Sequence, residues 1–143
     1  MQYFLFLFFF FWSSFAVASE SFTLYTGLQP MSISQKELKK YLIGQKSTWE
    51  NGENVVILLY PTASPQMTFL CSEIIGIPEA TYRRFIIEKA FRSGLQLIEI
   101  EDVKNAHEAL QNHPGSIVVF SEEDKTTFET EKNIVIHPIT VEK

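Results

Sequence analysis

The sequence predicts an α/β fold in which strands and helices alternate along one domain. Val55–Tyr60 and Ser116–Phe120 are continuous apolar runs of strand length, and such runs are typical of strands buried on both faces of a sheet. Between them lie stretches whose apolar residues fall at helical spacing. Strands that alternate with helices favour a largely parallel or mixed sheet flanked by helices.

The first 18 residues indicate a secretory signal peptide. Tyr3–Trp12 is an unbroken apolar run that is shorter than the roughly 20 residues a membrane span requires. Ala16-Val17-Ala18 supplies the small residues that a signal peptidase accepts, so we expect cleavage between Ala18 and Ser19. A retained membrane anchor is the alternative, because no Lys or Arg precedes the apolar run. We expect residues 19–143 to form one periplasmic or secreted domain.

Composition limits the partners of this domain. The chain carries 17 acidic and 12 basic residues, for a formal net charge of −5, and no block of Lys or Arg. This balance disfavours nucleic acid as a partner. Cys71 is the single cysteine, so no disulfide can form within the chain. No stretch after the signal is apolar enough to span a membrane, and a water-soluble domain is expected.

The first elements are a strand at Phe22–Thr26 and a helix at Gln35–Ile43. Ser34 precedes the helix and Glu37 follows three residues later, which is the spacing of a reciprocal capping box. Gly44 can adopt the left-handed conformation that ends a helix. This segment therefore has clear signals at both helix ends.

A turn at residues 49–52 separates that helix from the buried strand Val55–Tyr60. A proline at Pro65 suits the first turn of a second helix, which we expect to continue to Gly76. Its apolar residues fall at helical spacing and form the clearest amphipathic pattern of the chain: Met67, Leu70, Cys71, Ile74 and Ile75.

Four further elements complete the pattern. We expect a helix from Pro78 to Ser93, with Tyr82, Phe85, Ile86 and Ala90 on one side, then a strand at Leu95–Ile100. Asp102 can cap a helix that ends before Pro114-Gly115. After the strand Ser116–Phe120, Ser121–Lys132 reads as a charged loop or a short helix, and Ile134–Ile136 reads as a final strand.

Four short motifs follow one another along the chain. Their order resembles the phosphate-binding component of bacterial phosphate ABC transporters, in its short single-domain forms. The resemblance implies one lobe of a type 2 periplasmic-binding-protein-like fold and a substrate-binding, non-enzymatic role in transport. The motifs are Ser32–Ser34 with Glu37-Leu38, Tyr41-Leu42 and Gly44, then Trp49, Asn51 and Gly52; Ser64-Pro65 with Gly76; Phe91–Gly94; and Val103, Ala109 and Leu110 leading to Pro114–Ile117.

The resemblance further implies a small anion, such as phosphate, held by amides at helix N-termini and by hydroxyl and arginine side chains. Met67 stands where the family commonly has an arginine, and Val118-Val119 replaces its glycine-tyrosine pair. Methionine cannot pair with phosphate, so Met67→Arg is expected to raise anion affinity. The departure also favours an alternative function, a ligand-free interaction module of the cell envelope that keeps the fold.

Two pairs of hydroxyl residues are candidate ligand-binding residues. Thr62 and Ser64 lie at the start of the Pro65 helix, where the amides of Gln66 and Met67 could join them around an anion. Ser32 and Ser34 precede the first helix. For Ser64, Ser32 and Ser34, the simpler interpretation is capping of a helix N-terminus.

Aromatic and basic residues supply further candidates. Trp49 could stack on a ligand or plug the edge of the core. Arg83 and Arg84 could assist anion binding, but with Glu79 and Glu88 nearby a solvated helix face is the more ordinary interpretation.

Enzyme chemistry finds little support in the sequence. His107, His113 and His137 lack the spacing of metal ligands, and Cys71 lies in an apolar stripe that predicts a buried thiol. Hydrolase-type serine motifs and phosphate-cradling glycine loops do not occur. We expect no catalytic residue, metal or cofactor. Because one lobe leaves an anion half exposed, a homodimer or an envelope protein is expected to supply the second wall of the site.

Overall fold

The computed structural model describes residues 21–132 and 136–143. The expected signal peptide and its cleavage site lie outside these residues. Within them, no helix is both long and apolar enough to cross a membrane. The strands are β1 (Phe22–Thr26), β2 (Met31–Ser34), β3 (Val56–Leu59), β4 (Gln96–Glu99), β5 (Ser116–Ser121) and β6 (His137–Glu142). The helices are α1 (Gln35–Leu42), α2 (Pro65–Phe69), the π-helix η1 (Leu70–Ile75), α3 (Glu79–Ser93), α4 (Val103–Asn112) and α5 (Glu122–Lys132).

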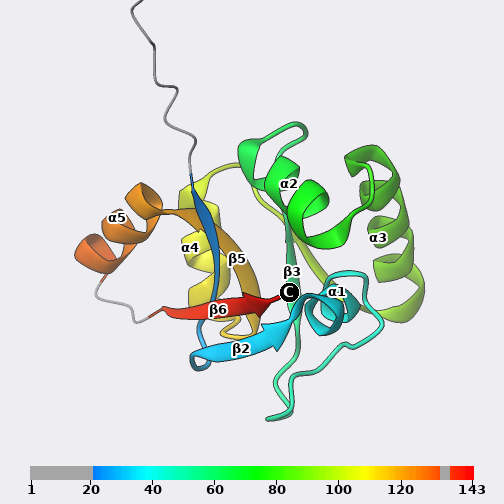
Figure 1. The fold of residues 1–143 in the computed structure, drawn as a ribbon, viewed down its shortest axis with the longest axis horizontal. Coiled ribbons are helices and arrows are strands. Elements are labelled where there is room, and N and C mark those ends of the chain that lie inside the picture. Colours follow the sequence, from blue (N-terminus) through cyan, green and yellow to red (C-terminus); the bar gives the residue numbers. More distant parts are fainter. Residues whose placement is uncertain (1–20, 133–135) are drawn as a thin grey trace, which may run out of the picture.

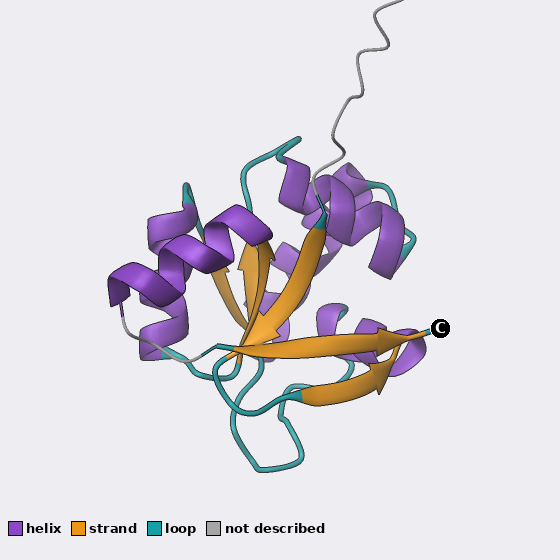
Figure 2. Ribbon diagram, turned by 60° about the vertical axis from the view of Figure 1, so that its left-hand side comes forward, coloured by secondary structure: helices purple, strands orange, loops and turns teal. Residues whose placement is uncertain are grey.

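One mixed sheet organises the chain, as the sequence predicts. Its strand order is β2-β6-β1-β5-β3-β4. Strands β5, β3 and β4 run parallel to one another, whereas β1 is antiparallel to both of its neighbours, β5 and β6. Helices α4 and α5 lie on one side of the parallel strands, and α1, α2 and α3 lie on the other (Figure 1). Figure 2 shows that β2 and β6 run across the direction of the other strands.

The core lies between the parallel strands and the helices on both sides. All residues of β3 and β5 are buried, which explains their continuous apolar runs. Tyr82 and Ile86 of α3 cover one face, while Phe128 of α5 packs against Phe120 of β5 with ring centroids 5.7 Å apart. This packing fixes the carboxyl end of β3, where the candidate site lies.

The antiparallel part of the sheet differs from the sequence-based expectation. The structure places the last strand at His137–Glu142; Ile136 precedes this strand, and the rest of the expected strand Ile134–Ile136 lies outside the described residues. Strand β2 was not predicted. The two missed strands pair with each other in parallel register. Strand β2 has four residues and alternates polar serines with apolar residues. Pro138 in β6 argues against a central strand.

Three other elements add detail to the sequence-based predictions. The Pro65 helix changes to a π-helix at Leu70, and the N–H of Gly76 bonds the carbonyl of Cys71, five residues earlier, over 2.8 Å. Residues 122–132 form a helix rather than a loop. Strand β4 (Gln96–Glu99) is shorter than the expected strand Leu95–Ile100 and lies at the edge of the sheet, where Leu97 is half buried.

Candidate functional site

The turn after β3 forms the mouth of α2. The N–H of Ser64 bonds the carbonyl of Pro61 over 3.0 Å, and the Ser64 hydroxyl accepts a hydrogen bond from the N–H of Met67 over 3.3 Å. Ser64 is therefore the N-cap of α2, with its side-chain oxygen directed at the helix backbone. Ala63, between these residues, has a positive φ of 60°, which is uncommon for a residue other than glycine.

A carboxylate from α3 already occupies this mouth. The N–H of Ala63 donates to both oxygens of Glu79, at 3.1 Å each. A backbone amide at a helix mouth is the type of donor that binds an anion. Here the amide has an acidic side chain of the same protein as its partner.

Thr62 and Arg83 line one cavity at the carboxyl ends of β3 and β4. The cavity has a volume of about 560 Å³ and is also lined by Glu99, Ile100 and Glu101. Arg83 is half buried, and its guanidinium Nη2 donates to the carbonyl of Tyr60. Arg83 therefore does not belong to a solvated face, contrary to the sequence-based interpretation, whereas Arg84 is exposed.

One nitrogen of the Arg83 guanidinium is left without a partner. Its Nε is buried and has no hydrogen-bond partner among the residues that the structure describes. A buried donor without a partner carries a desolvation cost. The position of Arg83 could have been found in the sequence, because it stands three residues before Ile86 and next to Tyr82, at the border of the buried face of α3.

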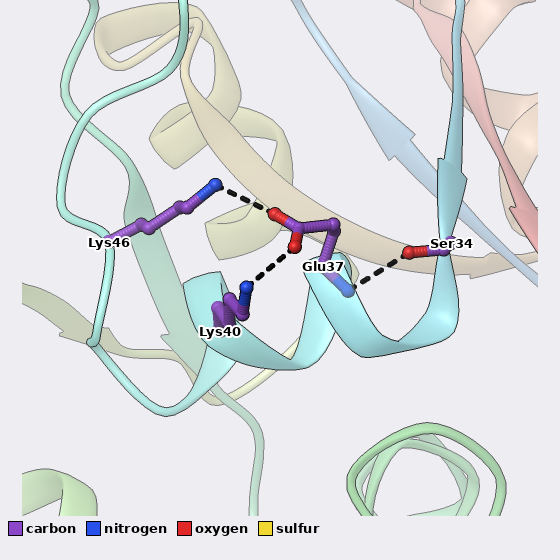
Figure 3. A network of polar contacts seen from close by, with 4 residues as sticks. All are labelled: Ser34, Glu37, Lys40 and Lys46. Carbon is purple, nitrogen blue, oxygen red and sulfur yellow. Dashed lines mark hydrogen bonds and ion pairs between the residues drawn. The ribbon is translucent and has the colours of Figure 1, made fainter.

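Ser34 caps α1, as the simpler interpretation of this residue predicts. Its hydroxyl accepts from the N–H of Glu37 over 3.2 Å, and the Glu37 carboxylate pairs with Lys40 at 2.6 Å and Lys46 at 2.7 Å (Figure 3). The hydrogen bonds from these two ammonium groups lower the pKa of Glu37 to about 2. The Ser34 side chain thus caps the helix by accepting from the N–H of the same Glu37 whose carboxylate forms the two ion pairs.

Ser32 lies in a different cavity from Thr62. Its hydroxyl donates to the Glu142 carboxylate over 2.5 Å, and it lines a cavity of about 150 Å³ together with Trp49 and Asn51. Trp49 itself is buried, with its ring 4.5 Å from that of Tyr41. Trp49 closes the edge of the core, and Thr62 and Ser32 do not share one site.

The remaining chemical candidates are core residues. Cys71 is buried, and burial raises the pKa of its thiol, which disfavours the reactive thiolate. His107 is buried with its ring 4.1 Å from that of Phe128. Across residues 21–132 and 136–143, no group of three His, Cys, Asp or Glu residues is placed to hold a metal ion.

Neither a family model nor a curated protein matches the sequence. Among solved structures, the chain is similar to the crystal structure of PstS from Borrelia burgdorferi, with a TM-score of 0.59 and 14% sequence identity. The match covers 87% of this chain and 48% of that one, so the chain spans about half the length of PstS. The six-stranded mixed sheet with its flanking helices is the fold of a PstS-like periplasmic-binding-protein domain.

Proposed function

We propose that the protein is an exported, non-enzymatic binding protein that holds a small phosphate-like anion at the carboxyl end of β3. Residues 19–143 form its domain, with residues 1–18 as the signal peptide. The observation that carries the proposal is the half-buried guanidinium of Arg83, which lines one cavity with Thr62. This guanidinium supplies the cation that Met67 cannot supply.

The location supports ligand binding on general grounds. Open α/β sheets bind ligands in the crevice beyond the carboxyl ends of their parallel strands, and β3 and β4 are such strands. Arginine presents a planar set of donors that matches the oxygens of a phosphate group. The hydroxyl of Thr62 lines the cavity and could donate to an oxyanion there. Among the described residues, Ser64 caps α2 and does not line this cavity.

The two carboxylates of the cavity restrict the type of anion. Glu99 and Glu101 line the same cavity as Arg83, and an ionised carboxylate can only accept hydrogen bonds. A fully deprotonated oxyanion would be repelled, whereas an oxyanion that carries a proton can donate to a carboxylate. Phosphate at neutral pH carries such a proton and sulfate does not. We therefore expect phosphate to bind more tightly than sulfate.

A second candidate function is the ligand-free interaction module of the cell envelope. The Glu79 carboxylate supports it, because this side chain takes the Ala63 amide that an anion would use. The complete burial of Met67 also supports it, since no cation can replace this side chain without disturbing the core. In this second candidate function, the fold keeps the cavity but the cavity binds no ligand.

Titration with phosphate distinguishes the two candidates. The exported protein is purified from a host periplasm, and its melting temperature and Trp49 fluorescence are followed with phosphate and with sulfate at low salt. A ligand that binds only the native state raises the melting temperature saturably, and we expect this with phosphate. Arg83→Gln should abolish the rise, while the exposed neighbour variant Arg84→Gln should retain it. A flat response up to millimolar phosphate would favour the interaction module.

A further inference from the structure

The cavity that Thr62 and Arg83 line carries charges of both signs on its walls. Arg83 supplies a guanidinium, whereas Glu99 and Glu101 supply two carboxylates. Within the part of the chain that the structure describes, neither carboxylate forms an ion pair with Arg83 or with any other residue. The guanidinium donates to the carbonyl of Tyr60 instead. Opposite charges therefore line one cavity without pairing with each other.

The acidic side of this cavity continues towards α4. A second cavity of about 480 Å³ shares Glu99, Ile100 and Glu101 with the first and is also lined by Glu108. No Lys or Arg is among the described residues that line this second cavity. The three glutamates are exposed, so a ligand in solution can reach their carboxylates. The two cavities adjoin at the end of β4, with Arg83 on one side and the carboxylates on the other.

We propose that the ligand is a small zwitterion that carries a phosphoryl group and an ammonium group, an inference that rests on the proposed anion site. The phosphoryl group binds Arg83 and the hydroxyl of Thr62. The ammonium group binds Glu99 and Glu101, because an ammonium has three N–H donors and an ionised carboxylate only accepts. The cavity of Arg83 has a volume of about 560 Å³, which lies within the roughly 300–1,000 Å³ of small-ligand sites.

Charge balance favours this zwitterion over a simple phosphate. Two carboxylates and one guanidinium leave the lining of the cavity with an excess of negative charge. A phosphate monoester carries about −1.5 to −2 charges at pH 7, so the carboxylates repel it. An ammonium group on the same molecule replaces this repulsion with an attraction between opposite charges. The ligand then satisfies both walls of the cavity at once.

The phosphoryl group distinguishes this ligand from an amino acid, which is also a zwitterion. A phosphoryl group presents three acceptor oxygens, whereas a carboxylate presents two in one plane. Arg83 belongs to α3 and Thr62 to the turn after β3. Donors that come from two different elements can bind separate oxygens of a tetrahedral group, and we expect the site to prefer this group.

Matched ligands test the ammonium contact. Isothermal titration calorimetry at low salt compares aminoethyl phosphate with ethyl phosphate, which has the same phosphoryl group and no ammonium. We expect the exported protein to bind aminoethyl phosphate at least about tenfold more tightly. Equal affinities overturn this inference and leave the proposed anion site in place. If neither compound binds, the proposed function fails as well. β-Alanine that binds as tightly as aminoethyl phosphate overturns the preference for a phosphoryl group.

Neutral variants of the two carboxylates should change the two affinities in opposite directions. Glu99→Gln and Glu101→Gln should each weaken aminoethyl phosphate at least about threefold and strengthen ethyl phosphate, because the lost charge attracts an ammonium and repels a phosphate. A damaged fold would weaken both ligands. Glu73→Gln is the control for net charge: this exposed carboxylate of η1 lines neither cavity and should leave the affinity ratio unchanged. A ratio equal to that of wild type in both test variants overturns the inference.

Two sources can supply this chemistry, a free aminoalkyl phosphate and the head group of a phospholipid. Glycerophosphoethanolamine, a soluble diester, and vesicles of phosphatidylethanolamine represent the lipid. Binding of aminoethyl phosphate without binding of the diester or the vesicles assigns the free compound. Binding of the diester together with sedimentation on the vesicles, both lost in Arg83→Gln, assigns the head group. Either result supports the shared site.

Discussion

The indole N–H of Trp49 donates a hydrogen bond to the carbonyl oxygen of Gly115 over 2.8 Å, across 66 residues of sequence. Glycine is required at this contact, because a Cβ atom at position 115 would lie 2.0 Å from the carbonyl oxygen of Asn54. The sequence presents Trp49 and the Pro114-Gly115 motif as separate signals. In the structure they contact each other.

This contact predicts unequal effects of two substitutions. Gly115→Ala should destabilise the protein by more than about 3 kcal/mol, because the new methyl group collides with backbone. Trp49→Phe should cost about 1–3 kcal/mol, since it leaves a buried carbonyl without its donor. Urea unfolding followed by circular dichroism measures both. Gly94→Ala is the control, because open space surrounds its Cβ position and only its φ of 69° opposes alanine.

Met67→Arg should destabilise the protein rather than raise anion affinity. Met67 is fully buried, so the arginine would place an unpaired charge in the core at a cost of several kcal/mol. The sequence-based expectation of higher affinity rested on the arginine that the resembled family commonly has at this position. Thermal unfolding should show a large loss in Met67→Arg and less than about 1.5 kcal/mol in Met67→Leu, which conserves volume. A folded Met67→Arg protein with tighter phosphate binding would contradict this prediction.

Glu79→Gln should raise phosphate affinity about threefold to tenfold. The substitution removes a negative charge from the Ala63 amide, worth about 1 kcal/mol in a solvated site, and retains an oxygen that can accept from this amide. Isothermal titration calorimetry measures the change. Glu73→Gln, an exposed carboxylate of η1, controls for net charge. Equal affinities in both variants would mean that Glu79 does not obstruct the site.

Acid should weaken the ion-paired N-terminus of α1. The pKa of Glu37 in the folded protein is lowered from 4.5 to about 2 by Lys40 and Lys46, so its stabilising contribution is present above pH 4.5 and is lost as the pH falls towards 2. Melting temperatures of wild type and Glu37→Gln should therefore converge over this interval. The effect should be small and should shrink at high salt, because the group is exposed to solvent.

Alkali should weaken the contact between α3 and α1. The Tyr82 hydroxyl donates to the carbonyl of Leu42 over 2.7 Å, and burial raises its pKa well above the ordinary value of 10. Above pH 10 the unfolded chain ionises this group and the folded protein does not, so stability falls as the pH rises. Tyr82→Phe should be less stable at pH 8 and show a shallower decline above pH 10. Parallel slopes would exclude Tyr82 as a cause.

The parallel half of the fold could be predicted from sequence because its signals are local. Buried runs identified β3 and β5, and the caps at Ser34, Ser64 and Asp102 identified helix starts that the structure confirms. Strands β2 and β6 could not be predicted in the same way. Backbone hydrogen bonds between β2 and β6 help to stabilise both strands. The sequence of either segment alone does not indicate such a long-range pairing.

The candidate site was predictable only in part. The hydroxyls of Thr62 and Ser64 follow a buried strand and precede a helix, and sequence order alone shows this. The approach of Arg83 and Glu79 depends on how α3 packs against the carboxyl end of β3. Both residues belong to a charged helical pattern that favoured a solvated face. The place of Arg83 beside the buried Tyr82 was a sequence signal for its role, whereas the contact of the Glu79 carboxylate with the Ala63 amide depended on the three-dimensional arrangement.

The central position of β6 has a consequence for biosynthesis. Strands β1 and β2 are separated by β6, and the hydrogen bond from the Ser32 hydroxyl to the Glu142 carboxylate spans 110 residues. Strands β1 and β2 cannot complete their pairing until the ribosome has synthesised β6, which follows them by about a hundred residues. Slow closure of a long-range ladder keeps a chain open during synthesis. An open chain is the form that the proposed export would require.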